Sequence, residues 1–456
     1  MKFLLSIIGV LLWAGVVDAK GVLFDGTDAQ TDQLMQAAEE SIEANRKGVL
    51  SVTMVDSTGA VINASAHLEL LAHSFDFGTS LYGFHKLALD NPAREPALKG
   101  IEAVFNTLTV CNYWSQVHWG LDRELSWTHP DNGYQIADEL EKRTRHHALL
   151  FGFPRWLHEY ETEEAAWGAI ENRMRQVGER YGDRIRELDV INEFINYQYW
   201  DKNPHAQYLK TTHYPDMAKP ENGARALRMA RKYFPKTKLV VLESNLWSVS
   251  NPVFQEIYEY HKELIRLKAP YDYIGYQAHY FSMRGMRFEE GTPDFGPRTF
   301  MMDAISRGLD QIASLGKPIV ITEFNGPTRS NKNKDPNQPG ISAEALAAWE
   351  SNFYTLIFSK PYMVGLSRWF TIDSLGGRGM DAGIVTEAGQ LKPNYYALKK
   401  LIKEDWHTQV RAEPSNGEVS FEGFYGTYRL RVDGFEDVVL DFQKGSPART
   451  VRLRTK

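Results

Sequence analysis

Short apolar runs alternate with amphipathic helical segments through most of the chain, and this alternation restricts the fold more than any other feature. Each run is bounded by polar or turn residues and is rich in β-branched or aromatic side chains, which predicts a buried parallel strand. Eight such units in succession predict an α/β protein, a (β/α)8 TIM barrel, more readily than an open sheet. The predicted strands are residues 75–80, 105–109, 148–151, 188–191, 239–242, 273–276, 319–322 and 364–370. Helical patterns between them include residues 163–181, 223–233, 252–268, 299–315 and 343–359.

Two of the predicted strands lead directly to a glutamate. Residues 188–191 are followed by Asn192-Glu193, and residues 319–322 are followed by Glu323. In a (β/α)8 barrel the carboxyl ends of the strands form the catalytic face. A single glutamate at a strand end is as consistent with a solvated loop carboxylate as with a catalytic one. A pair of them is what glycoside hydrolysis needs, with one carboxyl group as proton donor and the other as nucleophile or base.

The first residues have the pattern of an export signal. A short basic start, Met1-Lys2, precedes an apolar run over residues 3–17, and small residues surround Ala19. This pattern predicts a signal peptide over residues 1–19, cleaved after Ala19, because the run is short for a membrane span. We expect a secreted or periplasmic protein without stable membrane association after cleavage. Failure of cleavage would leave a membrane-tethered start.

The segments on either side of the predicted barrel are β-rich. Residues 20–72 form a lead-in, with a helix over 28–47 and a predicted β-hairpin of residues 49–55 and 60–71. The barrel is expected over residues 73–404, with a last helix at 392–402. Residues 405–456 are predicted to form a small β module, which could share a sheet with the hairpin. Its predicted strands are residues 419–421, 428–432, 438–442 and 450–453.

Composition excludes several classes of function. The net charge of −6 argues against a nucleic-acid partner. The single cysteine, Cys111, excludes an intramolecular disulfide, and an exported chain without disulfides is typical of bacterial export. The sequence contains no Cys/His cluster, so we expect no metal site and no cofactor. We expect a monomer whose partner is a polysaccharide or oligosaccharide substrate.

One long loop follows the strand that leads to Glu323. Residues 328–342 are polar, contain several Asn and Pro residues and show no apolar period. Such a loop is either a solvent-exposed insertion or a lid that contacts substrate, and the sequence leaves both open.

The polar and aromatic residues at the predicted strand ends give the chain a family resemblance. It resembles glycoside hydrolase family 10, the xylanase-type (β/α)8 barrels, over roughly residues 47–403. The two motifs that carry most of the resemblance are Asp-Val-Ile-Asn-Glu at 189–193 and Ile-Thr-Glu at 321–323. The other matches, in family order, are Phe77-Gly78, residues 105–107, His147, residues 154–156, residues 274–279, Trp369 and residues 392–397.

The resemblance implies a role for each matching residue. Glu193 would be the general acid/base and Glu323 the nucleophile. Asn192 would hydrogen-bond the 2-hydroxyl group of the sugar. His279, with Gln277 beside it, would keep Glu323 ionised and oriented.

The remaining matches would line the sugar site. His147 would line the subsite where cleavage occurs, and Trp369 would stack on the sugar ring or wall it off. Asn245, in the polar stretch that follows the fifth predicted strand, is a further candidate for substrate binding.

The chain departs from the family pattern in the residues that grip the sugar. The family's Asn-Glu-x-Lys-Trp stretch corresponds to residues 115–119, so that Gln116, His118 and Trp119 stand at its Glu, Lys and Trp. Phe151 and Gly152 stand where the family has a Trp and a second His, and we interpret Gly152 as opening volume at the site. Phe324-Asn325 follows the nucleophile where the family has Leu-Asp.

The combined pattern predicts a secreted retaining glycosidase, most like an endo-1,4-β-xylanase, acting on xylan or a decorated xylan. A retaining mechanism requires the two carboxyl groups to lie about 5–5.5 Å apart. Because hydrogen-bond donors to the sugar ring are missing and Gly152 suggests extra room at the cleavage site, we expect weak activity on plain linear xylan. The alternatives are a glycosidase of the same barrel with a different glycan or exo specificity, and a non-catalytic carbohydrate-binding barrel.

Overall fold

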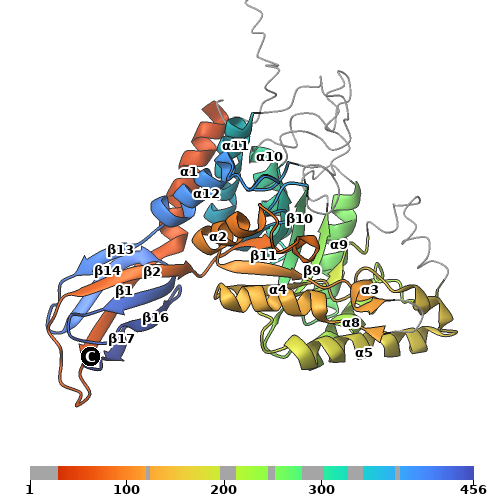
Figure 1. Ribbon diagram of the computed structural model, residues 1–456, viewed down its shortest axis with the longest axis horizontal. Helices are drawn as coiled ribbons and strands as arrows, with labels where there is room; N and C mark the ends of the chain where they lie inside the picture. Colours follow the sequence, from red (N-terminus) through yellow and green to blue (C-terminus); the bar gives the residue numbers. More distant parts are fainter. Residues whose placement is uncertain are drawn as a thin grey trace, which may run out of the picture.

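The computed structural model describes residues 29–119, 124–195, 212–244, 252–279, 302–326, 342–374 and 381–456. Eight parallel strands close into a barrel, each paired with its neighbours in chain order and the last paired with the first, which confirms the predicted (β/α)8 fold (Figure 1). Along the chain the barrel strands are β3 (Asp76–Ser80), β4 (Thr107–Cys111), β7 (Arg143–His147), β8 (Glu187–Asn192), β9 (Lys238–Ser244), β10 (Tyr273–His279), β11 (Ile319–Asn325) and β12 (Met363–Arg368).

Helices surround the barrel and cover the outer faces of its strands (Figure 1). Two of them begin at a side-chain cap: Thr162 accepts a hydrogen bond from the Ala165 amide, and Ser342 accepts one from the Ala345 amide. The helices are α1 (Ala29–Arg46), α2 (Arg94–Val104), α4 (Thr128–Glu139), α5 (Glu163–Tyr181), α8 (Pro220–Tyr233), α9 (Pro252–Arg266), α10 (Met302–Ala313), α11 (Ala343–Ser359) and α12 (Pro393–Lys400). Shorter elements are η1 (Phe84–Lys86), α3 (Trp114–Val117), β5 (His118–Trp119), β6 (Glu124–Leu125), η2 (Arg155–Glu159) and η4 (Leu401–Asp405).

The third barrel strand was predicted in the wrong place. It is β7 (Arg143–His147), whereas the apolar run chosen from the sequence is residues 148–151. The true strand is polar because its side chains find partners inside the protein. The Arg145 guanidinium is buried and paired with Glu187 and Asp189, and His146 Nδ1 lies 2.8 Å from the Tyr134 hydroxyl. Buried charges are tolerated when they are paired, so polarity alone did not exclude a core strand.

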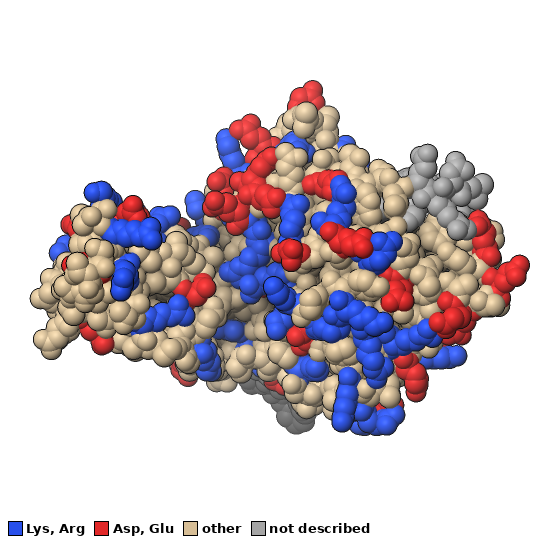
Figure 2. All heavy atoms as spheres, turned by 90° about the horizontal axis from the view of Figure 1, so that it is seen from below, with Lys and Arg blue, Asp and Glu red and all other residues tan. Residues whose placement is uncertain are grey.

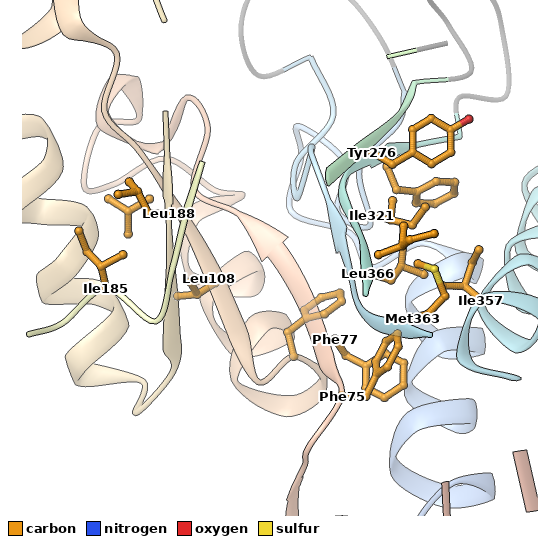
Figure 3. Close-up of a cluster of buried hydrophobic side chains, with 14 of the residues drawn as sticks. Phe75, Phe77, Leu108, Ile185, Leu188, Tyr276, Ile321, Ile357, Met363 and Leu366 are labelled. Atoms are coloured by element: carbon orange, nitrogen blue, oxygen red, sulfur yellow. The ribbon is translucent and has the colours of Figure 1, made fainter. Parts of the chain in front are cut away.

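Aromatic and aliphatic side chains connect the barrel to helix α11. Figure 3 shows Phe75 and Phe77 beside Met363 of β12 and Ile357 of α11. The Phe77 ring also lies 5.8 Å from the Trp406 ring, so the core continues from the barrel into the segment that leads to the β module. Burial of one such side chain contributes about 1.5–3 kcal/mol to stability.

The predicted N-terminal hairpin is paired only at its turn, where Val55 bridges Val61, and beyond the turn the prediction is wrong because the two strands belong to different sheets. β1 (Lys47–Val55) lies between β14 and β17, whereas β2 (Ala66–His73) lies between β13 and β15. Strands from both ends of the chain therefore build one β module, in line with the suggested sharing of a sheet. The C-terminal strands are β13 (Gln409–Ala412), β14 (Glu418–Phe424), β15 (Gly426–Arg431), β16 (Val438–Phe442) and β17 (Arg449–Arg452).

Each of the two strands has its own alternation of buried and exposed residues, and each finds a partner from the C-terminal part of the chain. The Phe421 ring of one sheet lies 5.1 Å from the Tyr428 ring of the other, which joins the two sheets. A local hairpin signal cannot reveal partners that are this distant in sequence.

The outer surface carries charges of both signs. Figure 2 shows Lys and Arg side chains gathered across the middle of the face seen from below, with acidic side chains around them. Ion pairs join surface charges of opposite sign: Arg180 Nε lies 2.9 Å from Asp131, and Arg225 lies 2.8 Å from Glu164. Within the described ranges, no helix has the length and apolar character that a membrane crossing demands.

Candidate active site

The two predicted catalytic glutamates lie at the carboxyl ends of β8 and β11. Glu193 directly follows β8 and has a φ of 52°, in the left-handed region that a residue with a side chain seldom adopts. Its amide donates a hydrogen bond to the Leu242 carbonyl, 3.1 Å away, which holds the strained residue against β9. Glu323 lies within β11 and is 3 % exposed. Backbone strain of this kind persists where the surrounding structure fixes it, and it is concentrated at functional sites.

The side-chain amide of Gln277 bridges the two glutamates. Its Nε2 atom lies 2.9 Å from Glu193 Oε1, 3.0 Å from Glu323 Oε1 and 2.9 Å from Asn192 Oδ1. Both carboxylate oxygens are within hydrogen-bond reach of one nitrogen, so they are no more than about 6 Å apart, which is below the separation of about 6.5–9.5 Å typical of inverting glycosidases.

The register of β10 against β11 places Gln277 in this position. The pairing shifts by one residue between Tyr276 and Gln277, so that Gln277 lies opposite Glu323 and His279 lies opposite Asn325. A bulge of this kind redirects side chains at the end of a strand, and such irregularities are common beside active sites. Two side chains of β10 therefore contact the nucleophile candidate together.

The surroundings of Glu193 favour its protonated form. Burial raises the pKa of this carboxyl group, and the negative charge of Glu323 raises it further. The hydrogen bond from Gln277 acts in the opposite direction but does not cancel the other two effects. A carboxyl group with a raised pKa beside an ionised one is the arrangement in which one acts as acid and the other as nucleophile or base.

Two histidines approach the two oxygens of Glu323. His279 Nε2 lies 2.8 Å from Oε2, and His147 Nε2 lies 3.6 Å from Oε1. Burial lowers the pKa of His147, but Glu323 and a 2.9 Å hydrogen bond to Asp189 outweigh burial, so the pKa of His147 is raised overall. His147 therefore carries positive charge up to a higher pH than a free histidine, close to the carboxylate that must remain ionised.

Asn192 and Trp369 complete the described part of the site. Asn192 is buried, and its Nδ2 atom has no hydrogen-bond partner among the described residues. An unpaired buried donor beside two carboxylates is suited to a hydroxyl group of a bound sugar. The Trp369 ring lies 4.9 Å from His147, 6.2 Å from His279 and 5.0 Å from Tyr82, so it forms one wall of the site.

Several predicted residues are not brought into the site by the described structure. Gln116 lies on α3, and His118 and Trp119 form β5, all beyond the end of β4 at Cys111, and their side chains lie outside the described residues. Asn245, the signal peptide at residues 1–19 and residues 328–341 of the long loop also lie outside the described residues.

Sequence reasoning did not assign a role to Tyr113 or Asn325. The Tyr113 ring lies 5.7 Å from His147, and burial raises the pKa of its phenol well above the usual value, so the hydroxyl group stays neutral. Asn325 is two residues beyond Glu323 on the same strand, and residues at this spacing share one face. That spacing is the signal by which Asn325 could have been found.

The interpretation of Gly152 as open volume is wrong. Gly152 has a φ of +63°, and a Cβ added to it would lie 2.8 Å from the Cβ of Tyr113. Tyr113 already fills the space that was assigned to a substituent, and a side chain at position 152 would be strained by the backbone as well.

Residues 70–400 match the family described as Glycosyl hydrolase family 10. The chain belongs to glycosyl hydrolase family 10. The described residues of the candidate active site all lie within this matched range.

The sequence relatives of this chain include a regulatory protein and an enzyme. The chain is 23 % identical over 434 residues to the anti-sigma-I factor RsgI6 of Acetivibrio thermocellus, covering 91 % of this chain and 49 % of that protein. It is 23 % identical over 335 residues to endo-1,4-beta-xylanase 2 of Arabidopsis thaliana, covering 69 % of this chain and 27 % of that protein. The chain thus spans about half or less of the length of these two relatives.

Solved structures of xylanases share the fold. Native xylanase 10B from Thermotoga maritima superposes with a TM-score of 0.56 at 21 % identity, covering 73 % of this chain and 96 % of that one. Xylanase 10B from Thermotoga petrophila, solved in complex with xylobiose, gives the same TM-score and identity and covers 73 % and 95 %. At this level of identity the likeness supports the barrel fold.

Proposed function

We propose that this protein is a retaining glycoside hydrolase that cleaves a β-linked polysaccharide, acting like an endo-1,4-β-xylanase on xylan or a decorated xylan. The observation that carries the proposal is the bridge from Gln277 Nε2 to Glu193 and Glu323, at 2.9 Å and 3.0 Å. It holds two carboxyl groups at the close spacing that direct attack on the anomeric carbon requires.

The unequal surroundings of the two glutamates assign their roles. Glu193, whose pKa is raised, donates a proton to the leaving-group oxygen while the Glu323 carboxylate attacks the anomeric carbon. A covalent glycosyl-enzyme forms, and a water then attacks it with Glu193 acting as base. The free donor of Asn192 is suited to a sugar hydroxyl group during both steps, and the Trp369 ring offers an apolar wall.

The choice of substrate rests on the relatives. Xylanases are found both among the sequence relatives and among the structural neighbours, and one neighbour was solved with xylobiose. The carboxylate pair supports the reaction type but does not distinguish one glycan from another. Xylan is therefore the first substrate class to test.

A second candidate function is carbohydrate sensing without turnover. The match to an anti-sigma-I factor covers 91 % of this chain, against 69 % for the plant xylanase, so it extends beyond the barrel into the flanking segments. A sensing role would need sugar binding alone. The intact pair of glutamates, with a raised pKa at Glu193, favours hydrolysis.

Release of reducing sugar from a panel of glycans tests the proposal, with linear xylan, decorated xylans, mixed-linkage β-glucan and mannan as substrates. Activity that disappears in Glu323→Gln supports hydrolysis at this site. Proton NMR of the first product then reports its anomeric configuration, and a β-configured first product is expected for retention. Binding of oligosaccharide by calorimetry without any release would favour the sensing role instead.

We further propose that the protein is exported, on the basis of the sequence of residues 1–19. N-terminal sequencing of the protein from its native host is expected to begin at Lys20. A protein that retains Met1 would contradict this proposal.

A further inference from the structure

Asn325 contacts the histidine that supports the nucleophile. It lies on β11, directly opposite His279 of β10, and it is fully buried. Its Nδ2 atom is 2.7 Å from His279 Nδ1, and the other ring nitrogen of His279, Nε2, is 2.8 Å from Glu323 Oε2. The three side chains thus form a chain from amide to imidazole to carboxylate.

The chemistry of an amide nitrogen fixes the direction of these hydrogen bonds. A side-chain amide nitrogen donates and has no lone pair to accept with, so in this contact His279 Nδ1 must be the acceptor. An imidazole that accepts at Nδ1 carries its proton on Nε2, where it points at the Glu323 carboxylate. A ring with this proton arrangement donates to Glu323 without a positive charge.

We propose that Asn325 is a positioning residue that holds His279 as a neutral imidazole with its proton on Nε2. The ring then orients Glu323 through a hydrogen bond without placing positive charge on Oε2. This inference deepens the proposed hydrolase function and rests on it, because it assigns Glu323 as the nucleophile. An aspartate at position 325 would accept from Nδ1 and would favour the doubly protonated imidazolium.

The charges around His279 explain why its protonation state affects Glu323 as a nucleophile. In the part of the chain that the structure describes, the ionisable neighbours are Glu323 at 2.8 Å, Glu193, whose pKa a charged His279 would lower, and His147 on the far oxygen of Glu323. His147, whose pKa is raised, supplies positive charge at Oε1. A second cation at Oε2 would stabilise the carboxylate further and make it a weaker nucleophile.

The opposite orientation of the Asn325 carboxamide predicts a different protonation state of His279. Asn325 Oδ1 is buried and has no hydrogen-bond partner among the described residues. Rotation of the carboxamide would bring this oxygen to His279 Nδ1, and both ring nitrogens would then need a proton, because a bare Nε2 would face the carboxylate. A neutral amide oxygen supports an imidazolium less well than a carboxylate does. The two arrangements differ by one proton.

Nitrogen-15 NMR of the full-length protein, labelled at histidine, reads this proton directly. His279→Gln serves to assign the His279 signals by their loss. In the wild type at pH 7 we expect one protonated nitrogen, Nε2, and one unprotonated nitrogen, Nδ1. In Asn325→Asp we expect both nitrogens to be protonated. The buried histidines His73 and His261 provide control signals, because burial lowers the pKa of each to about 3 and both stay neutral in the two proteins.

Kinetics provide a second readout that a purely structural role would not move. The added imidazolium in Asn325→Asp should lower the pKa of the nucleophile, so the acidic limb of the kcat/KM profile should move down by about one pH unit. The rate at the optimum should fall several-fold. Wild-type His279 with a proton on Nδ1, or Asn325→Asp with unchanged NMR signals, overturns the proposal. If the protein hydrolyses no glycan, the NMR result still decides the proton position, so the two failures are distinguishable.

Discussion

Replacement of Gln277 by methionine tests whether the amide bridge sets the working pH of the site. Methionine has a similar length and volume but cannot donate a hydrogen bond. The change removes the donor that lies within 2.9 Å of Glu193 and 3.0 Å of Glu323. Because the bond from Gln277 lowers the pKa of Glu193, its loss should raise that pKa further.

The size of the shift follows from the geometry. A hydrogen bond to a charged group contributes about 1.5–3 kcal/mol, and one pKa unit corresponds to about 1.4 kcal/mol. The amide nitrogen has two hydrogens and three acceptors, the third being Asn192 at 2.9 Å, so each carboxylate receives only part of this energy. We therefore expect the pKa of Glu193 to rise by about one unit. The loss of orientation should also lower kcat by about 10–100-fold.

The assay is kcat/KM as a function of pH on an unactivated oligosaccharide, whose leaving group needs protonation by Glu193. The alkaline limb reports deprotonation of the acid, so it should move to higher pH in Gln277→Met. The control is Gln135→Met, which removes a 2.8 Å bond to Glu139 on the exposed face of α4 and should leave both limbs in place. An alkaline limb of Gln277→Met that stays fixed, or that moves to lower pH, would refute the reasoning.

Four further substitutions have defined outcomes. Glu323→Gln should lower the rate on an activated aryl glycoside at least about 1,000-fold, whereas Glu193→Gln should keep most of the first step, and equal losses in stopped-flow assays would contradict the roles. Gly152→Ala should cost about 2–4 kcal/mol in urea unfolding, from its φ of +63° and the 2.8 Å contact with Tyr113, and a cost below about 0.5 kcal/mol would contradict the clash. Arg145→Met should cost about 3–5 kcal/mol at pH 8 and less at pH 5, because the buried Glu187 carboxylate loses its guanidinium partner and becomes protonated at the lower pH. A loss that does not depend on pH would speak against this.

Apolar patterns predicted the barrel because most of its strands bury both faces. β9 and β11 are continuous apolar runs that end in polar residues, and this form is visible in the sequence. β7 was misplaced because Arg145 and the neighbouring histidines are stabilised by partners on β8 and α4, and those partners are known only once the fold is known. The hairpin failed for a related reason, since strand pairing depends on which strands are available.

The candidate site was predictable to the level of single residues but not of their contacts. The position of Glu193 and Glu323 at strand ends follows from the pattern alone. The bridge from Gln277 depends on a one-residue shift between β10 and β11, which no property of either strand reveals. The crowding at Gly152 depends on Tyr113, which approaches from the loop after a different strand.

The interleaving of the two chain ends in the β module has a consequence for biosynthesis. β1 precedes the barrel in the sequence, whereas its two neighbours, β14 and β17, follow the barrel and are made only after it. β1 and β2 must therefore stay unpaired while the entire barrel is translated, and unpaired strand edges are prone to self-association. Expression of residues 73–404 alone would avoid this delay, but it would leave Phe77 and the base of the barrel without Trp406 as a packing partner. The β module can therefore form only after the barrel has been translated.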